Sequence, residues 1–174
     1  MRQAWIRSLL AACFIFMAWN AAAQSEVVQR YVSQAQKVGE DRLTYLFWDV
    51  YDASLYAPEG RFSPDHPFAL QLLYLRALEG DQIAERSAHE MREQGYGDET
   101  QLQQWLQLMM RIFPDVKEGD AITGIRTREG HAVFYLNDRQ IGVIEDSEFS
   151  ERFFDIWLGS KSSEPAMRQR LLGL

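Results

Sequence analysis

The stretch VGEDRLTYLFWDVYDASLYAPEG, residues Val38–Gly60, is the most strand-prone part of the sequence and decides the fold. From Leu43 to Tyr56, large apolar side chains occupy both alternating sets of positions. This pattern is typical of strands that are covered, at least in part, on both faces. The Pro-Glu-Gly sequence at 58–60 ends the run, as turn-forming residues do. The stretch therefore predicts the start of a sheet that is packed against other elements.

The rest of the chain alternates between strand and helix patterns. Residues 24–37 are weakly patterned and predict at most one edge strand. Further strands are expected at 68–78, 121–127, 131–136 and 140–144, and helices at 81–94, 98–113, 147–158 and 165–172. Strands, then helices, then a meander, then helices predict an α+β domain, with a largely antiparallel sheet and helices on one face.

Residues 1–23 have the layout of a secretory signal peptide. Two arginines precede Leu9–Trp19, an apolar run too short to span a bilayer, and three alanines follow before residue 24. We therefore expect an exported, periplasmic protein whose mature domain is residues 24–174, with no membrane-spanning segment after cleavage. Its 151 residues suit one domain.

Composition excludes several classes of function. Cys13, the only cysteine, lies in the predicted signal peptide, so the mature chain has neither a disulfide nor a thiol nucleophile. The three histidines are scattered, and no glycine-rich phosphate-binding motif is present, so no metal and no cofactor are expected. Residues 24–174 contain 16 basic and 25 acidic residues, a net charge of −9. This charge argues against nucleic acid or anionic lipid headgroups as partners.

Arg42 is a permanent charge among aromatic residues. A guanidinium does not lose its proton, so Arg42 must meet an anion or remain at the rim of the core. That anion is either a ligand or one of the local carboxylates, Asp41, Asp49 or Asp52.

Glu90 is a second charge close to an apolar stripe, here on the helix expected at 81–94. It either points inward or faces solvent beside Arg86, four residues earlier on the same helix. The spacing of this acid–base pair favours the solvent-facing arrangement.

Several long segments resemble a known family. They are VGEDRLTYLFWDVYDASLYAPEG, PFALQLLYLRALEGDQIAERSAHEM, FPDVKEGDAITGI and FYLNDRQIGVIEDSEFSERFFDIWLG, followed by a closing LLGL. Together they are similar to the bacterial chalcone-isomerase-like proteins, an exported branch of the chalcone isomerase fold family. The resemblance covers the chain from about Val38 to its end. It implies an open-faced β-sandwich, in which a large antiparallel sheet carries helices on one face.

The family contains isomerases that close a flavanone ring and non-catalytic relatives that bind fatty acids. The resemblance implies that Arg42 is the arginine shared by both branches and that Tyr51 stands where the binders carry a tyrosine and the enzymes a threonine. It further implies that Ile83, Glu90 and Ile156 replace the enzymes' tyrosine, asparagine and late threonine. Two isoleucines offer no hydrogen bonds to a cyclising substrate, whereas an arginine with a tyrosine hydroxyl suits a carboxylate.

Three functions follow as hypotheses. The first is a non-catalytic binder of a small amphipathic carboxylate, such as a fatty acid, whose head group is held by Arg42 and Tyr51. The second is an isomerase of the chalcone isomerase class (an intramolecular lyase) acting on an enone. The third is a ligand-free envelope accessory protein, in which Asp49 or Asp52 neutralises Arg42 and no cavity adjoins it. No oligomeric state is predicted.

The first hypothesis has a geometric condition. Nine residues of straight strand span about 30 Å, so Arg42 and Tyr51 can meet only across a bend or hairpin.

Overall fold

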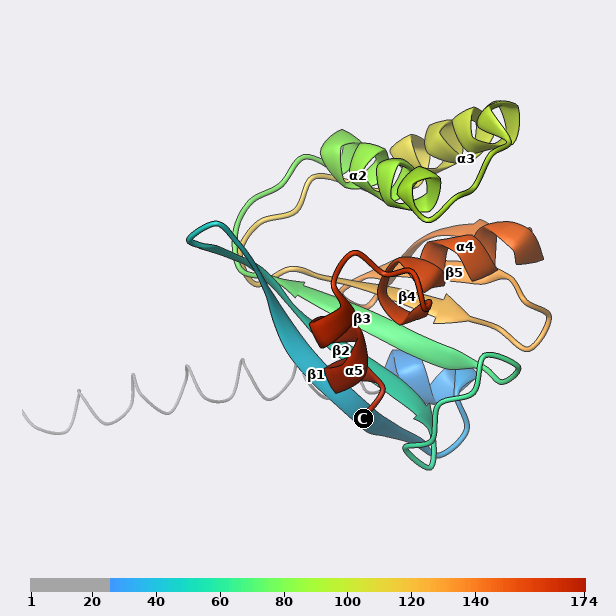
Figure 1. Cartoon of the computed structure of the whole chain (residues 1–174). Coiled ribbons are helices and arrows are strands. Elements are labelled where there is room, and N and C mark those ends of the chain that lie inside the picture. Colours follow the sequence, from blue (N-terminus) through green and yellow to red (C-terminus); the bar gives the residue numbers. More distant parts are fainter. Residues whose placement is uncertain (1–25) are drawn as a thin grey trace, which may run out of the picture.

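The computed structural model describes residues 26–174 and contains one antiparallel sheet, covered by helices on one face (Figure 1). The predicted signal peptide, residues 1–23, lies outside the described residues. The strands are β1 (Ala35–Tyr45), β2 (Trp48–Pro58), β3 (Phe68–Tyr74), β4 (Ala121–Arg126), β5 (Ala132–Leu136) and β6 (Arg139–Ile144). The helices are α2 (Gly80–Glu93), α3 (Glu99–Ile112), α4 (Ser147–Leu158) and α5 (Pro165–Leu171).

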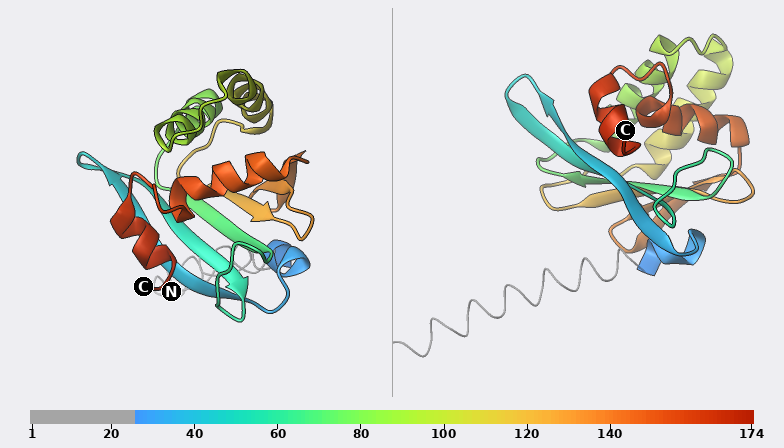
Figure 2. Two further views of the ribbon diagram at one scale, coloured as in Figure 1. Left: turned by 45° about the vertical axis from the view of Figure 1, so that its right-hand side comes forward. Right: turned by 60° about the horizontal axis from the view of Figure 1, so that its bottom comes forward.

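The six strands lie in the sheet in chain order, and every neighbouring pair is antiparallel. Helix α4 lies over this sheet, α2 and α3 lie above α4, and α5 lies against β1 and β2 (Figures 1 and 2). The predicted α+β architecture, an open sheet with helices on one face, is confirmed. Within residues 26–174, no helix has both the length and the apolar composition needed to cross a bilayer.

The opposite face of the sheet is covered in part by a short helix at 26–31. The sequence predicted at most an edge strand in this region, and β1 begins only at Ala35. Val27, Val28 and Val32 are buried against a small apolar patch on this face of the sheet. Burial of these valines accounts for a helix in a segment whose local pattern is weak.

Two aspartates cap the helices that build the covering layer. The side chain of Asp98 accepts a hydrogen bond from the backbone N–H of Gln101 at the start of α3. Helix α4 is capped by Asp146, which directly precedes the first helical residue, Ser147. Asp146 also accepts a hydrogen bond from Trp105 Nε1 at 2.9 Å. One carboxylate therefore both starts α4 and ties it to the buried face of α3.

The core between the sheet and α4 is largely aromatic. Phe134 of β5 makes edge-to-face contacts with Phe113, Phe149 and Phe153, with ring centroids 5.1 to 6.4 Å apart. Such pairs add about 0.5–1.5 kcal/mol each beyond the burial of their area. This cluster holds the helical layer over the meander formed by β4, β5 and β6.

Strands β1 and β2 form a long hairpin whose tip projects beyond the body of the protein (Figures 1 and 2). Tyr45 pairs with Trp48, so the turn consists of Leu46 and Phe47. The hairpin meets the geometric condition set above, since it returns the chain between residues 42 and 51.

Helix α5 sits on β1 at Gly39. A Cβ atom at this position would lie 2.0 Å from the backbone oxygen of Arg170 and 2.6 Å from that of Leu171. Nearby, the Arg170 guanidinium pairs with Asp41 at 2.7 Å. The absence of a side chain at residue 39 is therefore what lets α5 approach the strand.

We expect Gly39→Ala to lower the free energy of unfolding by about 1–3 kcal/mol, because the new methyl group must displace the α5 backbone. Chemical denaturation monitored by circular dichroism measures this change. Gly97→Ala is the matched control, since a Cβ atom there has no neighbour within 4 Å. Equal stabilities of the two variants would show that α5 does not depend on close approach at Gly39.

Candidate ligand-binding site

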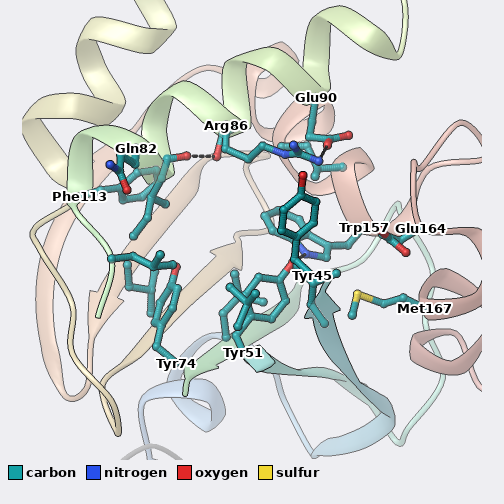
Figure 3. A pocket seen from close by; sticks show the side chains of 18 of the residues that line it. Tyr45, Tyr51, Tyr74, Gln82, Arg86, Glu90, Phe113, Trp157, Glu164 and Met167 are labelled. Carbon is teal, nitrogen blue, oxygen red and sulfur yellow. Dashed lines mark hydrogen bonds and ion pairs between the residues drawn. The ribbon is translucent and has the colours of Figure 1, made fainter. Parts of the chain in front are cut away.

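A cavity of about 360 Å³ lies between the helix-covered face of the sheet and the helices (Figure 3). Its size is within the range of about 300–1,000 Å³ that is usual for small-molecule sites. Most of its wall is apolar, and a few polar groups converge on it. The lining residues used below are Leu43, Tyr45, Val50, Tyr51, Leu72, Tyr74, Ile83, Arg86, Glu90, Ile122, Phe153, Ile156, Trp157 and Met167.

The sheet side of the cavity carries two tyrosines. Tyr51 of β2 pairs in register with Tyr74 of β3, and their rings meet edge to face with centroids 6.1 Å apart. The Tyr51 hydroxyl oxygen accepts a hydrogen bond from Trp157 Nε1 of α4 at 2.9 Å. An indole N–H only donates, so this bond fixes the direction of the Tyr51 hydroxyl and leaves its proton for another acceptor.

Burial changes the acidity of both tyrosines. It raises the pKa of Tyr51 from its ordinary value of 10.0 to about 12, and the hydrogen bond from Trp157 opposes this rise. Burial also raises the pKa of Tyr74, with a smaller contribution from the nearby Tyr51. Both hydroxyls are therefore neutral hydrogen-bond donors at physiological pH.

The helix side of the cavity is formed by one face of α2. Ile83, Arg86 and Glu90 line the cavity, at helical spacings of three and four residues. Arg86 forms an ion pair with Oε1 of Glu90, four residues later. Figure 3 shows the side chains of Arg86 and Glu90 together at the upper edge of the cavity.

Glu90 is buried, with 5% of its surface exposed, although the sequence favoured a solvent-facing position. The predicted contact with Arg86 is present, but the pair lies at the cavity and Arg86 is the exposed partner. Glu90 Oε2 has no hydrogen-bond partner among residues 26–174. Burial of a carboxylate oxygen without a partner is unfavourable, so Glu90 marks this wall as a functional candidate.

Arg42 does not lie in the cavity, which corrects the prediction that it shares a site with Tyr51. In the β1–β2 register, Leu43 is opposite Tyr51 and Arg42 is opposite Asp52. Because successive side chains of a strand point to opposite faces, Leu43 and Tyr51 face the helices and Arg42 faces away from them. The hairpin thus brings Arg42 and Tyr51 onto neighbouring strands but places their side chains on opposite faces of the sheet.

The partners of Arg42 are the local aspartates. Arg42 donates to Asp52 from Nε at 2.6 Å and from Nη2 at 2.9 Å, and to Asp49 from Nη1 at 2.9 Å. These hydrogen bonds, that to Asp52 foremost, raise the pKa of Arg42 above its ordinary value. The neutralisation expected by the ligand-free hypothesis is therefore present. Arg42 is also not among the residues that line the cavity, which lies on the opposite face of the same hairpin, so the question of a ligand passes from Arg42 to that cavity.

Four of the five positions singled out by the family resemblance line this one cavity. They are Tyr51, Ile83, Glu90 and Ile156. Arg86 was not singled out from the sequence as a site residue. Its position three residues after Ile83 on an amphipathic helix was the available indication, since both then share a face.

Comparison with known proteins is consistent with this picture. A family model described as chalcone isomerase-like matches residues 42–173, which confirms the resemblance at the level of the family. A solved fatty-acid binding protein from Arabidopsis thaliana has a similar structure, with a TM-score of 0.61 and 13% sequence identity. The match covers 81% of this chain and 88% of that one. At this identity the likeness shows the fold alone. No curated protein matches the chain.

We expect Tyr51→Phe to make stability less sensitive to alkaline pH. The unfolded chain releases the Tyr51 proton near pH 10 and the folded chain near pH 12, so stability is lost as pH rises between these values. Without the Tyr51 hydroxyl, the free energy of unfolding lost between pH 8 and pH 11 should be smaller by about 1 kcal/mol. Urea denaturation at pH 8 and pH 11 measures the difference.

The same variant leaves Trp157 Nε1 without its acceptor and should be about 1 kcal/mol less stable at pH 8. Tyr45→Phe, which removes an exposed hydroxyl, should change stability at pH 8 by less than about 0.5 kcal/mol. An unchanged alkaline loss in Tyr51→Phe would contradict the buried, neutral state assigned to this tyrosine.

Proposed function

The chain belongs to the chalcone isomerase-like family, and from this premise we propose that it is an exported, non-catalytic protein that binds a small amphipathic carboxylate such as a fatty acid. The observation that carries the proposal is the mainly apolar cavity of about 360 Å³, with an arginine and a tyrosine hydroxyl in its wall. The Arabidopsis protein with a similar fold is described as a fatty-acid binding protein, which supports this ligand class.

The head group is held by Arg86 and Tyr51 in this proposal, in place of Arg42 and Tyr51. Arg86 and Tyr51 both line the cavity, and the positive charge of Arg86 lowers the Tyr51 pKa, whereas the negative charges of Glu164 and Glu90, which line the same cavity, raise it. A guanidinium and a neutral hydroxyl can both donate to a carboxylate, and charge-assisted bonds of this kind are the stronger class. The carboxylate clamp expected from the sequence is retained, with its arginine supplied by α2.

Glu90 positions Arg86 for this role. Its Oε1 occupies one nitrogen of the guanidinium, Nη2, and a guanidinium has five N–H donors. The remaining donors are available to a ligand, while the ion pair holds the long and exposed Arg86 side chain over the cavity. The ligand's carboxylate binds on the side of Arg86 away from Glu90, because two carboxylates in direct contact repel each other.

The hydrocarbon tail lies against the apolar wall. Each buried methylene of a tail contributes about 0.8 kcal/mol, so a chain of several carbons outweighs the cost of ordering it. The wall combines aliphatic and aromatic side chains from the sheet and from three helices: Leu72, Ile83, Ile122, Phe153, Ile156 and Met167.

The isomerase hypothesis is less well supported by the same cavity. Ring closure needs polar groups that orient a phenolate and stabilise the developing enolate. Ile83 and Ile156, which replace the enzymes' tyrosine and threonine, line the cavity without offering a hydrogen bond. We therefore expect no acceleration of chalcone cyclisation by this protein in an absorbance assay.

Arg86→Ala should weaken fatty-acid binding by about 10-fold or more, because a charged hydrogen bond contributes about 1.5–3 kcal/mol. Displacement of a fluorescent fatty-acid analogue measures the affinity, and native mass spectrometry of the protein as isolated identifies the ligand it carries. Arg42→Ala is the matched control, since it removes an ion-paired arginine from the other face of the sheet. This variant should bind like the wild type.

Two results would overturn the assignment. If Arg42→Ala lost as much fatty-acid affinity as Arg86→Ala, the head group would be assigned to Arg42, as predicted from the sequence. Absence of any bound or displaceable fatty acid in the wild type would reject this ligand class.

A further inference from the structure

The tip of the β1–β2 hairpin exposes four large apolar side chains side by side. Phe47 is 95% exposed, Leu46 74%, and Tyr45 and Trp48 65% each. Scattered exposed apolar residues are normal, but a cluster of this kind on a projecting element marks an interaction site. In Figures 1 and 2 the tip stands clear of the helices, so no other described element covers it.

The two residues of the turn, Leu46 and Phe47, are not of the types that favour hairpin turns. Leu46 has a φ of 56°, in the left-handed region that glycine and asparagine adopt readily and a bulky residue adopts at a cost. Hairpin turns are usually built from Asn, Asp and Gly for this reason. The tip therefore keeps an apolar side chain where a polar residue would be more stable.

The side chains of the tip change from apolar at the apex to amphipathic behind it, which is the order found from the interior of a membrane to its surface. Leu46 and Phe47 stand at the apex, and Tyr45 and Trp48, which carry both an apolar ring and a polar group, stand behind them. Tyrosine and tryptophan favour the headgroup level of a bilayer, where both parts of the side chain are satisfied.

The charges nearest the tip are balanced. Arg42 pairs with Asp49 and Asp52, and Arg76 lies over the Trp48 ring at 5.6 Å from its centroid. These two arginines and two aspartates cancel, whereas the whole chain carries a net charge of −7. A locally neutral tip on an acidic protein suits a zwitterionic lipid surface and not an anionic one.

The tip is continuous with the cavity. Leu43, Tyr45 and Val50, from the hairpin close to the turn, line the cavity, and Tyr45, labelled in Figure 3, is 65% exposed, so the cavity opens to solvent beside the tip. A surface that contacts the tip therefore lies next to the opening through which an amphipathic ligand would pass. A second copy of the chain is a weaker candidate, because a stable protein interface takes about 20–30 residues on each side.

We infer that the hairpin tip, residues 45–48, inserts into the interface of a zwitterionic lipid bilayer and places the cavity mouth at the lipid surface. The inference rests on the proposed function, since it assigns the bilayer as the source or destination of the bound carboxylate. Binding of this kind is driven by burial of apolar side chains and depends little on salt.

The test is cosedimentation with phosphatidylcholine vesicles, compared between the wild type and the double variant Leu46→Asn, Phe47→Ser. Asparagine tolerates the left-handed conformation, so the variant should be at least as stable to heat as the wild type. We expect its partition onto vesicles to fall about 10-fold or more, because two apolar side chains are lost. Val143→Ser, on the 40% exposed Val143 of β6, is the control and should bind vesicles like the wild type.

The outcomes separate this inference from the proposed function. Fatty-acid affinity measured without vesicles should be unchanged in the double variant, while ligand transfer from vesicles slows. Fatty-acid binding by the wild type without vesicle binding would reject the tip as a membrane anchor and leave the proposed function standing. Vesicle binding that survives in the double variant, or self-association of the wild type through the tip in analytical ultracentrifugation, would also overturn the inference.

Discussion

Antiparallel pairing of β1 with β2 decides which side chains reach the cavity. Leu43–Tyr51 and Arg42–Asp52 are consecutive pairs in the register and face opposite sides of the sheet. A slip of one residue would exchange them and bring a charged pair into the cavity. Arg42 bonds to two carboxylates of β2 across the hairpin and so favours the observed register.

The cavity exists because the aromatic core does not extend to the hairpin. Phe113 and Phe153 are in contact within the aromatic cluster and also form part of the cavity wall. Beyond them, α2, α4 and α5 face β1, β2 and β3 with side chains that do not fill the space between the layers. Native cores are close-packed, so an unfilled volume of this size next to a well-packed cluster is the feature on which the proposed ligand binding rests.

The fold could be predicted because the strand and helix periods are strong in most of the chain, whereas the site could not be predicted in full. Residues 43–56 look like one apolar run, since Leu46 and Phe47 carry no turn signature. Without the position of the turn, the register was undetermined, and so was the face on which Arg42 lies. Glu90 lies on a face that the helical period identifies, but its charge argued for solvent, and only tertiary packing places it inside.

Two departures from local stability rules lie at the cavity and at the hairpin tip, and others occur elsewhere in residues 26–174. Other features follow those rules, such as the Asp98 cap of α3 and the proline at the start of α5. At the cavity, Glu90 leaves one buried oxygen without a partner, and at the tip Leu46 adopts a backbone conformation that suits smaller residues. Sequences that break local rules in this way do so mainly at functional sites. One hairpin carries the tip and lines the cavity beside Glu90, so under the proposed function both departures serve a single process, the passage of a ligand between a surface and the cavity.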